Sequence, residues 1–224
     1  MRVSVLLTPA PVAATCAIVV DVLRATTTLT VALANGARDI LPTATTGEAL
    51  ALRASRGSTL ACGEREGLIV AGFDLGNSPF EYTRERVAGK TLAFASTNGS
   101  QAMLAARAAR RRVLAAFVNA AAVVDAVAGE SEVAIVCAGK VGGFSVEDAC
   151  CAGLLVARLE GRGGIAEGAA ARFARAIAPA DAHEVRALVE GSAHARYLAS
   201  MGEAFARDVA FCAGLDSLDR AFAI

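Results

Sequence analysis

The chain has 224 residues, of which 22 are basic and 22 acidic, so its formal net charge is zero. That balance argues against a general surface for nucleic acid or anionic membranes, and 5% aromatic residues with no Trp argue against a stacking platform for single strands. The length and an apolar content of 55% suit one α/β domain over residues 1–224, and leave open whether residues 160–224 form a subdomain.

The first apolar run, residues 3–7, predicts a strand. The segment Thr8-Pro9-Ala10-Pro11 breaks this run before it reaches the length of a signal peptide's apolar region or of a spanning helix. We therefore expect a soluble, cytoplasmic protein.

Residues 17–20 form a short β-branched run, typical of a strand buried on both faces of a parallel sheet. Asp21 ends this strand, and the apolar pattern over residues 22–34 predicts a helix that stops at an Asn-Gly pair. Three consecutive threonines, 26–28, then lie near the helix N-terminus, where free amides, hydroxyls and Arg24 suit an anion beside a metal-binding Asp21. The alternative is that one Thr only caps the helix and that Asp21 pairs with Arg24.

Residues 39–42 and 59–61 predict strands, with a helix between them over residues 47–55. The next stretch, residues 62–81, carries four glycines among acids, an arginine and small polar groups. We interpret it as an irregular loop that handles a charged ligand or a metal. The alternative is a long solvated connection that is merely rich in turn residues.

Residues 91–95 predict another strand, followed by a polar turn at 96–100 and a helix to about residue 110. Asn98, Ser100 and the amides of this turn are candidate phosphate ligands. A plain helix cap followed by a turn glycine would explain the same segment.

Residues 113–118 and 132–136 predict strands, with a helix between them over 120–127. The second strand runs into a glycine-rich turn that contains Lys140. Ser145 then caps a helix to about residue 159, whose first turn holds Glu147 and Asp148. Negative side chains there suit the helix dipole, which explains one carboxylate more readily than two.

The C-terminal part predicts helices over residues 169–177, 182–190, 192–200 and 203–212. We interpret His194 as an ordinary helix histidine rather than a catalyst. Six cysteines without a C-x-x-C pair and only two histidines argue against a zinc site.

Three strand ends, at residues 21, 95–97 and 137–139, open into polar turns. Ligands of open α/β sheets bind at the carboxyl edge of the strands, so we expect these turns to converge there with residues 62–81. The sequence thus predicts a layered α/β/α fold with a largely parallel or mixed sheet and a helical C-terminal part. It also predicts a site for a phosphorylated small acid and Mg²⁺.

These motifs resemble, in order and over nearly the whole chain, the 2-phosphosulfolactate phosphatase family. They are Asp-Val-Leu-Arg-Ala-Thr-Thr-Thr (21–28), Gly-Glu-Arg-Glu-Gly (63–67), Gly-Phe-Asp-Leu-Gly-Asn-Ser-Pro-Phe-Glu (72–81), Thr-Asn-Gly-Ser (97–100) and Cys-Ala-Gly (137–139) with Glu-Asp (147–148). The resemblance implies a Mg²⁺-dependent phosphomonoesterase that hydrolyses 2-phospho-3-sulfolactate to 3-sulfolactate and phosphate, in the route to coenzyme M or in sulfolactate metabolism.

On this hypothesis, charge neutralisation and positioning account for most of the catalysis. The predicted catalytic residues are Asp21, Glu64 and Asp74, with Glu64 or Asp74 orienting the attacking water. The predicted metal ligands are Asp21, Asp74, Glu147 and Asp148. The predicted phosphate ligands are Arg24, Thr26, Thr27, Thr28, Asn98 and Ser100. The groups predicted to bind the substrate's carboxylate or sulfonate are Arg65, Asn77, Ser78 and Lys140.

Two alternatives remain open on the sequence. One is a phosphatase for other 2-phospho carboxylic acids, since no residue separates sulfonate from carboxylate recognition. The other is a non-catalytic module that binds an anionic metabolite, although such a module does not need so many carboxylates. The sequence also leaves open whether two copies pair as a homodimer.

Overall fold

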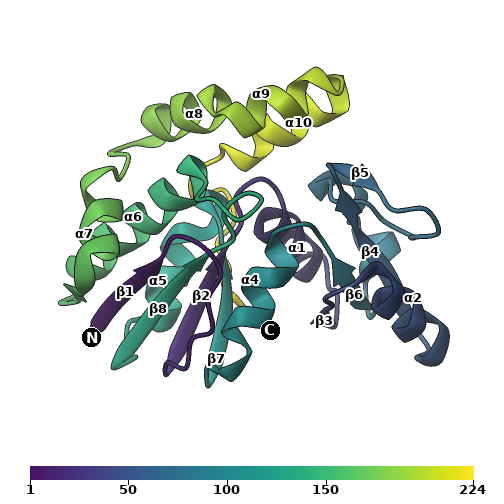
Figure 1. The fold of residues 1–224 in the computed structure, drawn as a ribbon, viewed down its shortest axis with the longest axis horizontal. Coiled ribbons are helices and arrows are strands. Elements are labelled where there is room, and N and C mark those ends of the chain that lie inside the picture. Colours follow the sequence, from purple (N-terminus) through teal and green to yellow (C-terminus); the bar gives the residue numbers. More distant parts are fainter.

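The computed structural model describes residues 1–224, and its larger sheet has six strands in the order β10-β7-β2-β8-β1-β9 (Figure 1). The neighbours are parallel except for β10, which is antiparallel to β7. The carboxyl ends of the central strands therefore share one edge of the sheet. The strands are β1 (Arg2–Leu6), β2 (Cys16–Val20), β7 (Arg111–Ala115), β8 (Glu132–Cys137), β9 (Ile165–Ala166) and β10 (Phe222–Ala223).

A second, smaller sheet has four strands in the order β3-β6-β4-β5. The first three are parallel, and β5 folds back antiparallel on the end of β4. The strands are β3 (Asp39–Pro42), β4 (Thr59–Arg65), β5 (Leu68–Ile69) and β6 (Thr91–Ala95).

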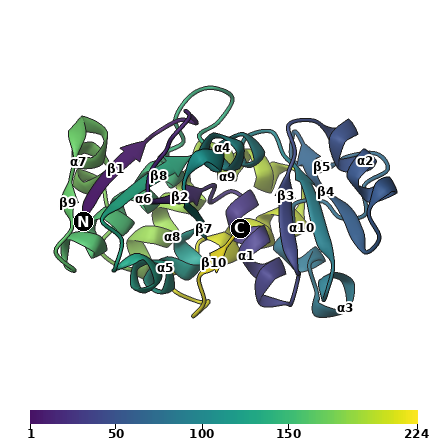
Figure 2. The same ribbon diagram turned by 90° about the horizontal axis from the view of Figure 1, so that it is seen from below.

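The helices complete a layered arrangement around the two sheets. Helices α1 and α4 lie between the sheets, α5, α6 and α7 cover the outer face of the larger sheet, and α2 covers the outer face of the smaller one (Figures 1 and 2). Their bounds are α1 (Ala25–Ala34), α2 (Thr46–Ser55), α4 (Gly99–Ala105), α5 (Ala120–Val127), α6 (Val146–Glu160) and α7 (Gly168–Ala176), with a single turn at α3 (Arg84–Val87).

The alternation of side chains along β2 explains this layering. Ile18 and Val20 join the core under α5 and α6, whereas Ala17 and Val19 join the core that contains α1 and the inner face of the smaller sheet. Successive residues of a strand point to opposite faces, so a run that is apolar at every position is buried on both sides. The prediction of a doubly buried strand at residues 17–20 is confirmed.

Three more helices, α8 (Ala182–Gly191), α9 (Ala193–Ser200) and α10 (Glu203–Cys212), follow one another above the carboxyl edge of the larger sheet (Figure 1). Val185, Leu198 and Val209, one from each helix, are buried in the same core cluster as α5 and α6. No helix is both long and apolar enough to cross a membrane.

The prediction of a layered α/β fold with parallel strands and a helical C-terminal part is confirmed, although the strands form two sheets instead of one. The expected irregular loop at 62–81 is wrong in its first part, because β4 continues to Arg65 and β5 follows at Leu68–Ile69. Gly63 pairs with Ala95 there, with a φ of 130°, and a Cβ on Gly63 would lie 1.9 Å from the carbonyl oxygen of Ala95. Glycine at this position allows two strands to approach closely.

Candidate active site

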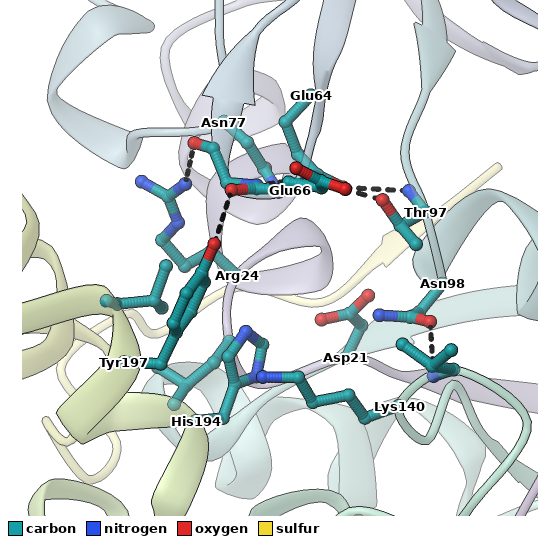
Figure 3. A pocket seen from close by; sticks show the side chains of 14 residues that line it. Asp21, Arg24, Glu64, Glu66, Asn77, Thr97, Asn98, Lys140, His194 and Tyr197 are labelled. Atoms are coloured by element: carbon teal, nitrogen blue, oxygen red, sulfur yellow. Dashed lines mark hydrogen bonds between the residues drawn. The ribbon is translucent and has the colours of Figure 1, made fainter. Parts of the chain in front are cut away.

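A cavity of about 510 Å³ opens where β2, β4, β6 and β8 end, and α9 forms one of its walls (Figure 3). Its position agrees with the expected convergence of the polar turns at the carboxyl edge. Polar and charged residues make up most of the lining. The lining residues are Asp21, Leu23, Arg24, Glu64, Glu66, Gly67, Asn77, Thr97, Asn98, Lys140, Val141, His194, Tyr197 and Leu198.

Asp21 lies at the centre of this cavity, in the turn between β2 and α1 (Figure 3). Its Oδ1 accepts a hydrogen bond of 3.3 Å from the amide of Ala25 in the first turn of the helix. Burial raises the pKa of the Asp21 carboxyl to about 7, because His194 and the Ala25 amide offset only part of the cost and the carboxylates of Glu64 and Glu147 add to it. A carboxyl in this state suits proton transfer or cation binding near neutral pH.

Glu64 lies across the cavity from Asp21 and is fixed by backbone amides. Its Oε1 accepts from the amide of Thr97 at 2.7 Å, and its Oε2 accepts from the amide of Gly67, also at 2.7 Å. These bonds connect the end of β4 to the turn after β6. The Thr97 hydroxyl also donates to Oε2 at 3.4 Å, but Oε1 keeps a second lone pair, so Glu64 can still accept a hydrogen bond from a water or ligand in the cavity.

Arg24 is the most deeply buried cation of the cavity, with only 4% of its side chain exposed. Its Nη2 donates to the carbonyl oxygen of Gly67 at 2.8 Å, and its Nη1 pairs with Asp208 of α10. The suggested pairing of Arg24 with Asp21 does not occur. A guanidinium has five N–H groups, so two contacts leave donors for an anion in the cavity.

Lys140 and Asn98 come from the turns after β8 and β6. The Oδ1 of Asn98 accepts from the amide of Val141 at 3.0 Å and so ties the two turns together. The Nζ of Lys140 lies 5.0 Å from the centre of the Tyr197 ring. Burial lowers the pKa of Lys140, while the nearby carboxylates of Glu147 and Glu64 act in the opposite direction.

His194 enters the cavity from α9, and its Nδ1 lies 3.3 Å from Oε1 of Glu147 in the first turn of α6. Burial would raise the pKa of Glu147, but its hydrogen bonds to His194 and to the backbone outweigh burial and lower it. An ionised Glu147 that holds one ring nitrogen orients the imidazole and leaves Nε2 for the cavity. The interpretation of His194 as an ordinary helix residue therefore misses a polar group of the site.

Asp148 lies beside the cavity and connects two of the turns that form it. Its two carboxyl oxygens accept from the amides of Val22 at 2.8 Å and Gly139 at 3.0 Å, which joins the turns after β2 and β8. Burial, followed by the charges of Asp21 and Glu147, raises the pKa of Asp148.

The predicted threonine ligands do not line the cavity, and all three are fully buried. Their hydroxyls fold back onto main-chain oxygens, which Ser and Thr hydroxyls readily do near helix ends. They donate to the carbonyl oxygens of Ala115 (from Thr26, 2.7 Å), Val22 (from Thr27, 2.9 Å) and Asn77 (from Thr28, 3.1 Å). The hydroxyl of Ser100 is likewise used inside its turn, where it donates to Phe94 and accepts from the amide of Ser96.

Three further predicted residues also lie outside the cavity. Asp74 accepts from the amide of Ala61 at 2.9 Å and pairs with Arg53, so it fastens the segment after β5 to the start of β4. The guanidinium of Arg65 donates to the carbonyl oxygen of Glu64 at 2.7 Å. The hydroxyl of Ser78 donates to Asp208 at 2.6 Å.

Asn77 lines the cavity together with Glu64, Glu66 and Gly67 from the same 62–81 segment. Its Oδ1 is buried and has no hydrogen-bond partner. A buried polar atom without a partner is unusual, so Asn77 is available to a donor group of a ligand or to a cation.

The predicted set of four metal ligands is not assembled. Only Asp21 of the four lines the cavity, because Asp74, Glu147 and Asp148 bond to backbone amides or to His194 instead. No group of three His, Cys, Asp or Glu side chains is arranged to hold a metal. Mg²⁺ commonly needs only one or two carboxylates, with water and substrate oxygens completing its shell. Asp21, whose ionisation is opposed by burial and by neighbouring carboxylates, fits that smaller requirement.

Four polar residues of the cavity were not predicted as site residues from the sequence: Glu66, Thr97, His194 and Tyr197. The last two are three residues apart on α9 and so share one helix face, with Leu198 beside them. That spacing is visible in the sequence, but nothing in it shows that this face turns toward the strand ends.

The chain also matches a known protein family in sequence. The family model described as 2-phosphosulpholactate phosphatase matches residues 5–222. A probable 2-phosphosulfolactate phosphatase of Thermotoga petrophila is 40% identical over 211 residues, which cover 94% of this chain and 89% of that protein. The protein of the same name from Deinococcus radiodurans is 42% identical over 205 residues, covering 90% of this chain and 84% of the relative.

Proposed function

Because the chain belongs to the 2-phosphosulpholactate phosphatase family, we propose that it hydrolyses the phosphate ester of 2-phospho-3-sulfolactate, releasing 3-sulfolactate and inorganic phosphate. The observation that carries the proposal is the cavity that gathers Arg24 and Lys140 with Asp21, Glu64 and His194. A substrate with phosphate, carboxylate and sulfonate groups needs cations and donors for three anions. This reaction would put the protein in sulfolactate metabolism or in the route to coenzyme M.

Arg24, Lys140 and Asn98 supply the anion-binding part of the site. Arg24 is buried and held at two of its nitrogens, so its remaining N–H groups have a fixed direction, which favours bidentate binding of a phosphate. Lys140 is a point charge on a flexible, half-buried side chain. We assign Arg24 to the phosphoryl group, and Lys140 to the carboxylate or sulfonate.

His194 and Glu64 supply the proton-transfer part. Glu147 holds Nδ1 of His194, so Nε2 is the atom that would protonate the alkoxide oxygen of sulfolactate as its bond to phosphorus breaks. Glu64, whose carboxylate is fixed by two amides, would orient the water that attacks phosphorus. Asp21 would hold Mg²⁺ together with oxygens of the substrate; a bound Mg²⁺ neutralises charge that develops on the phosphoryl oxygens.

The proposal is tested by phosphate release from racemic 2-phospho-3-sulfolactate, with 2-phospholactate and an aryl phosphate in parallel, each with Mg²⁺ and with EDTA. We expect release that depends on Mg²⁺ and is fastest from the sulfonate. Faster release from 2-phospholactate would reassign the substrate to other 2-phospho carboxylic acids. A folded protein that releases phosphate from none of them would refute the phosphatase proposal.

The chain offers a matched control for His194. Its other histidine, His183, is exposed on α8 and does not line the cavity. We expect His194→Gln to lower kcat by roughly 100-fold or more, as loss of a general acid does, and His183→Gln to leave it unchanged. Equal rates for the two variants would remove His194 from the mechanism.

A further inference from the structure

Asp208 of α10 is an almost fully buried acid that belongs to none of the motifs discussed above, with 2% of its side chain exposed. Both of its carboxyl oxygens are used. Oδ2 pairs with Nη1 of Arg24 at 2.5 Å, and Oδ1 accepts from the hydroxyl of Ser78 at 2.6 Å. One carboxylate thus joins three segments: the turn before α1, the segment before the short helix η1 (Pro79–Glu81), and α10.

Arg24 is held from several sides at once. Besides Asp208, it donates to the carbonyl oxygen of Gly67 at 2.8 Å, and its Cζ lies 5.0 Å from the centre of the Phe205 ring of α10. Asp208 and Phe205 are neighbours on one face of the same helix, because they are three residues apart. Helix α10 therefore determines both the in-plane direction and the stacking of the guanidinium.

Arg24 lies in the wall between two cavities, and Asp208 lies on the far side of that wall. Arg24 lines the cavity of about 510 Å³ and also a neighbouring cavity of about 330 Å³, whereas Asp208 lines only the smaller one. Asp208 therefore does not contact a ligand in the larger cavity, and Arg24 is the side chain that connects it to that cavity. Without Asp208, the Arg24 side chain would be free to turn into the smaller cavity, away from the substrate.

We propose that Asp208 is a positioning residue that aims Arg24 at the phosphoryl group of the substrate, with Ser78 fixing the Asp208 carboxylate in turn. This inference rests on the proposed function, since it takes Arg24 as a substrate ligand. A buried ion pair contributes little net stability, because desolvation offsets most of the attraction. Orientation of a substrate-binding donor therefore explains the Arg24–Asp208 pair better than stability does.

The test is a double-mutant cycle on kcat and KM for 2-phospho-3-sulfolactate with Mg²⁺. Asp208→Asn keeps the volume of the side chain and removes its charge, and we expect kcat/KM to fall about 10- to 100-fold, mainly in kcat, as for a misplaced donor. In the Arg24→Ala background the same change should have no further effect, since it acts through Arg24.

Asp216→Asn is the matched control. Asp216 also forms a paired carboxylate–guanidinium contact, with Arg158 at 2.6 and 2.9 Å, but it lies outside both cavities. We expect its kinetic constants to stay at the wild-type values. A loss in Asp208→Asn that is equally large with and without Arg24, or no loss at all, would overturn the proposal.

A spectroscopic measurement separates this proposal from the phosphatase proposal. The ¹⁵N NMR signals of the Arg24 guanidinium, assigned by their loss in Arg24→Lys, should shift and show faster rotation in Asp208→Asn but not in Asp216→Asn. If the wild type proves inactive on every ester, unchanged Arg24 signals in Asp208→Asn would still refute the positioning role. If Asp208→Asn does not fold, Ser78→Ala takes its place in the cycle, with a smaller loss of about threefold to tenfold expected.

Discussion

Replacing Asp21 by Asn should make the metal-free protein more stable at neutral and alkaline pH, although it removes a central group of the site. In the folded chain the pKa of the Asp21 carboxyl is raised from 3.8 to about 7, first by burial and then by the carboxylates of Glu64 and Glu147. A raised pKa means that ionisation of this group favours the unfolded state. Asn has the same shape, accepts the Ala25 amide and does not ionise.

The magnitude follows from the two pKa values. As the pH rises from 3.8 toward 7, Asp21 ionises in the unfolded chain but not in the folded one, so the free energy of unfolding of the wild type falls. One pKa unit is worth about 1.4 kcal/mol, so this fall amounts to about 4 kcal/mol. Above pH 7 the loss is complete and the curve is level again. Asp21→Asn lacks this loss, so the difference in unfolding free energy between variant and wild type should grow by about 4 kcal/mol from about pH 4 to about pH 8.

Urea denaturation in EDTA, at several values of pH, measures this difference directly. The acid Asp39 is exposed at the start of β3, so Asp39→Asn is the control for a lost carboxyl at the surface. A difference between Asp21→Asn and wild type that does not change with pH would refute the reasoning, because Asp21 would then ionise as easily in the folded as in the unfolded chain.

The remaining predictions concern single groups of the cavity. Burial lowers the pKa of Lys140, so kcat/KM should fall on the alkaline side as this ammonium deprotonates. Lys140→Arg should move that fall to higher pH in a pH–rate profile. A profile that does not move would mean that another group causes the alkaline fall. Gly99→Ala should destabilise the fold by about 1–3 kcal/mol in urea denaturation, because the new Cβ would lie 2.4 Å from Ala25 Cβ and 2.6 Å from Asp21 Oδ2. A variant as stable as the wild type would contradict this packing. Arg24→Ala should cost on the order of 3 kcal/mol of transition-state stabilisation, measured as kcat/KM, and near wild-type turnover would remove Arg24 from phosphate binding.

The sequence alone determined where polar turns interrupt the strands, and this was enough to place much of the cavity. Asp21, Asn98 and Lys140 each follow a strand whose apolar run is buried, and the structure brings all three into one cavity. The reason is general: parallel strands end at the same edge, so groups that follow them must be neighbours, whatever the packing of the rest.

Whether a polar side chain in those turns faces the cavity or the backbone was decided only by tertiary structure. The hydroxyl of Thr26 and the carboxylate of Asp74 suit a ligand as well as they suit a carbonyl or an amide, and local sequence does not distinguish the two uses. Contacts between segments that are distant in the sequence also cannot be predicted from local sequence. His194 meets Glu147, and Asp208 meets Arg24 across 184 residues, because α9 and α10 pack over the strand ends, and that packing depends on the whole core instead of on any one motif.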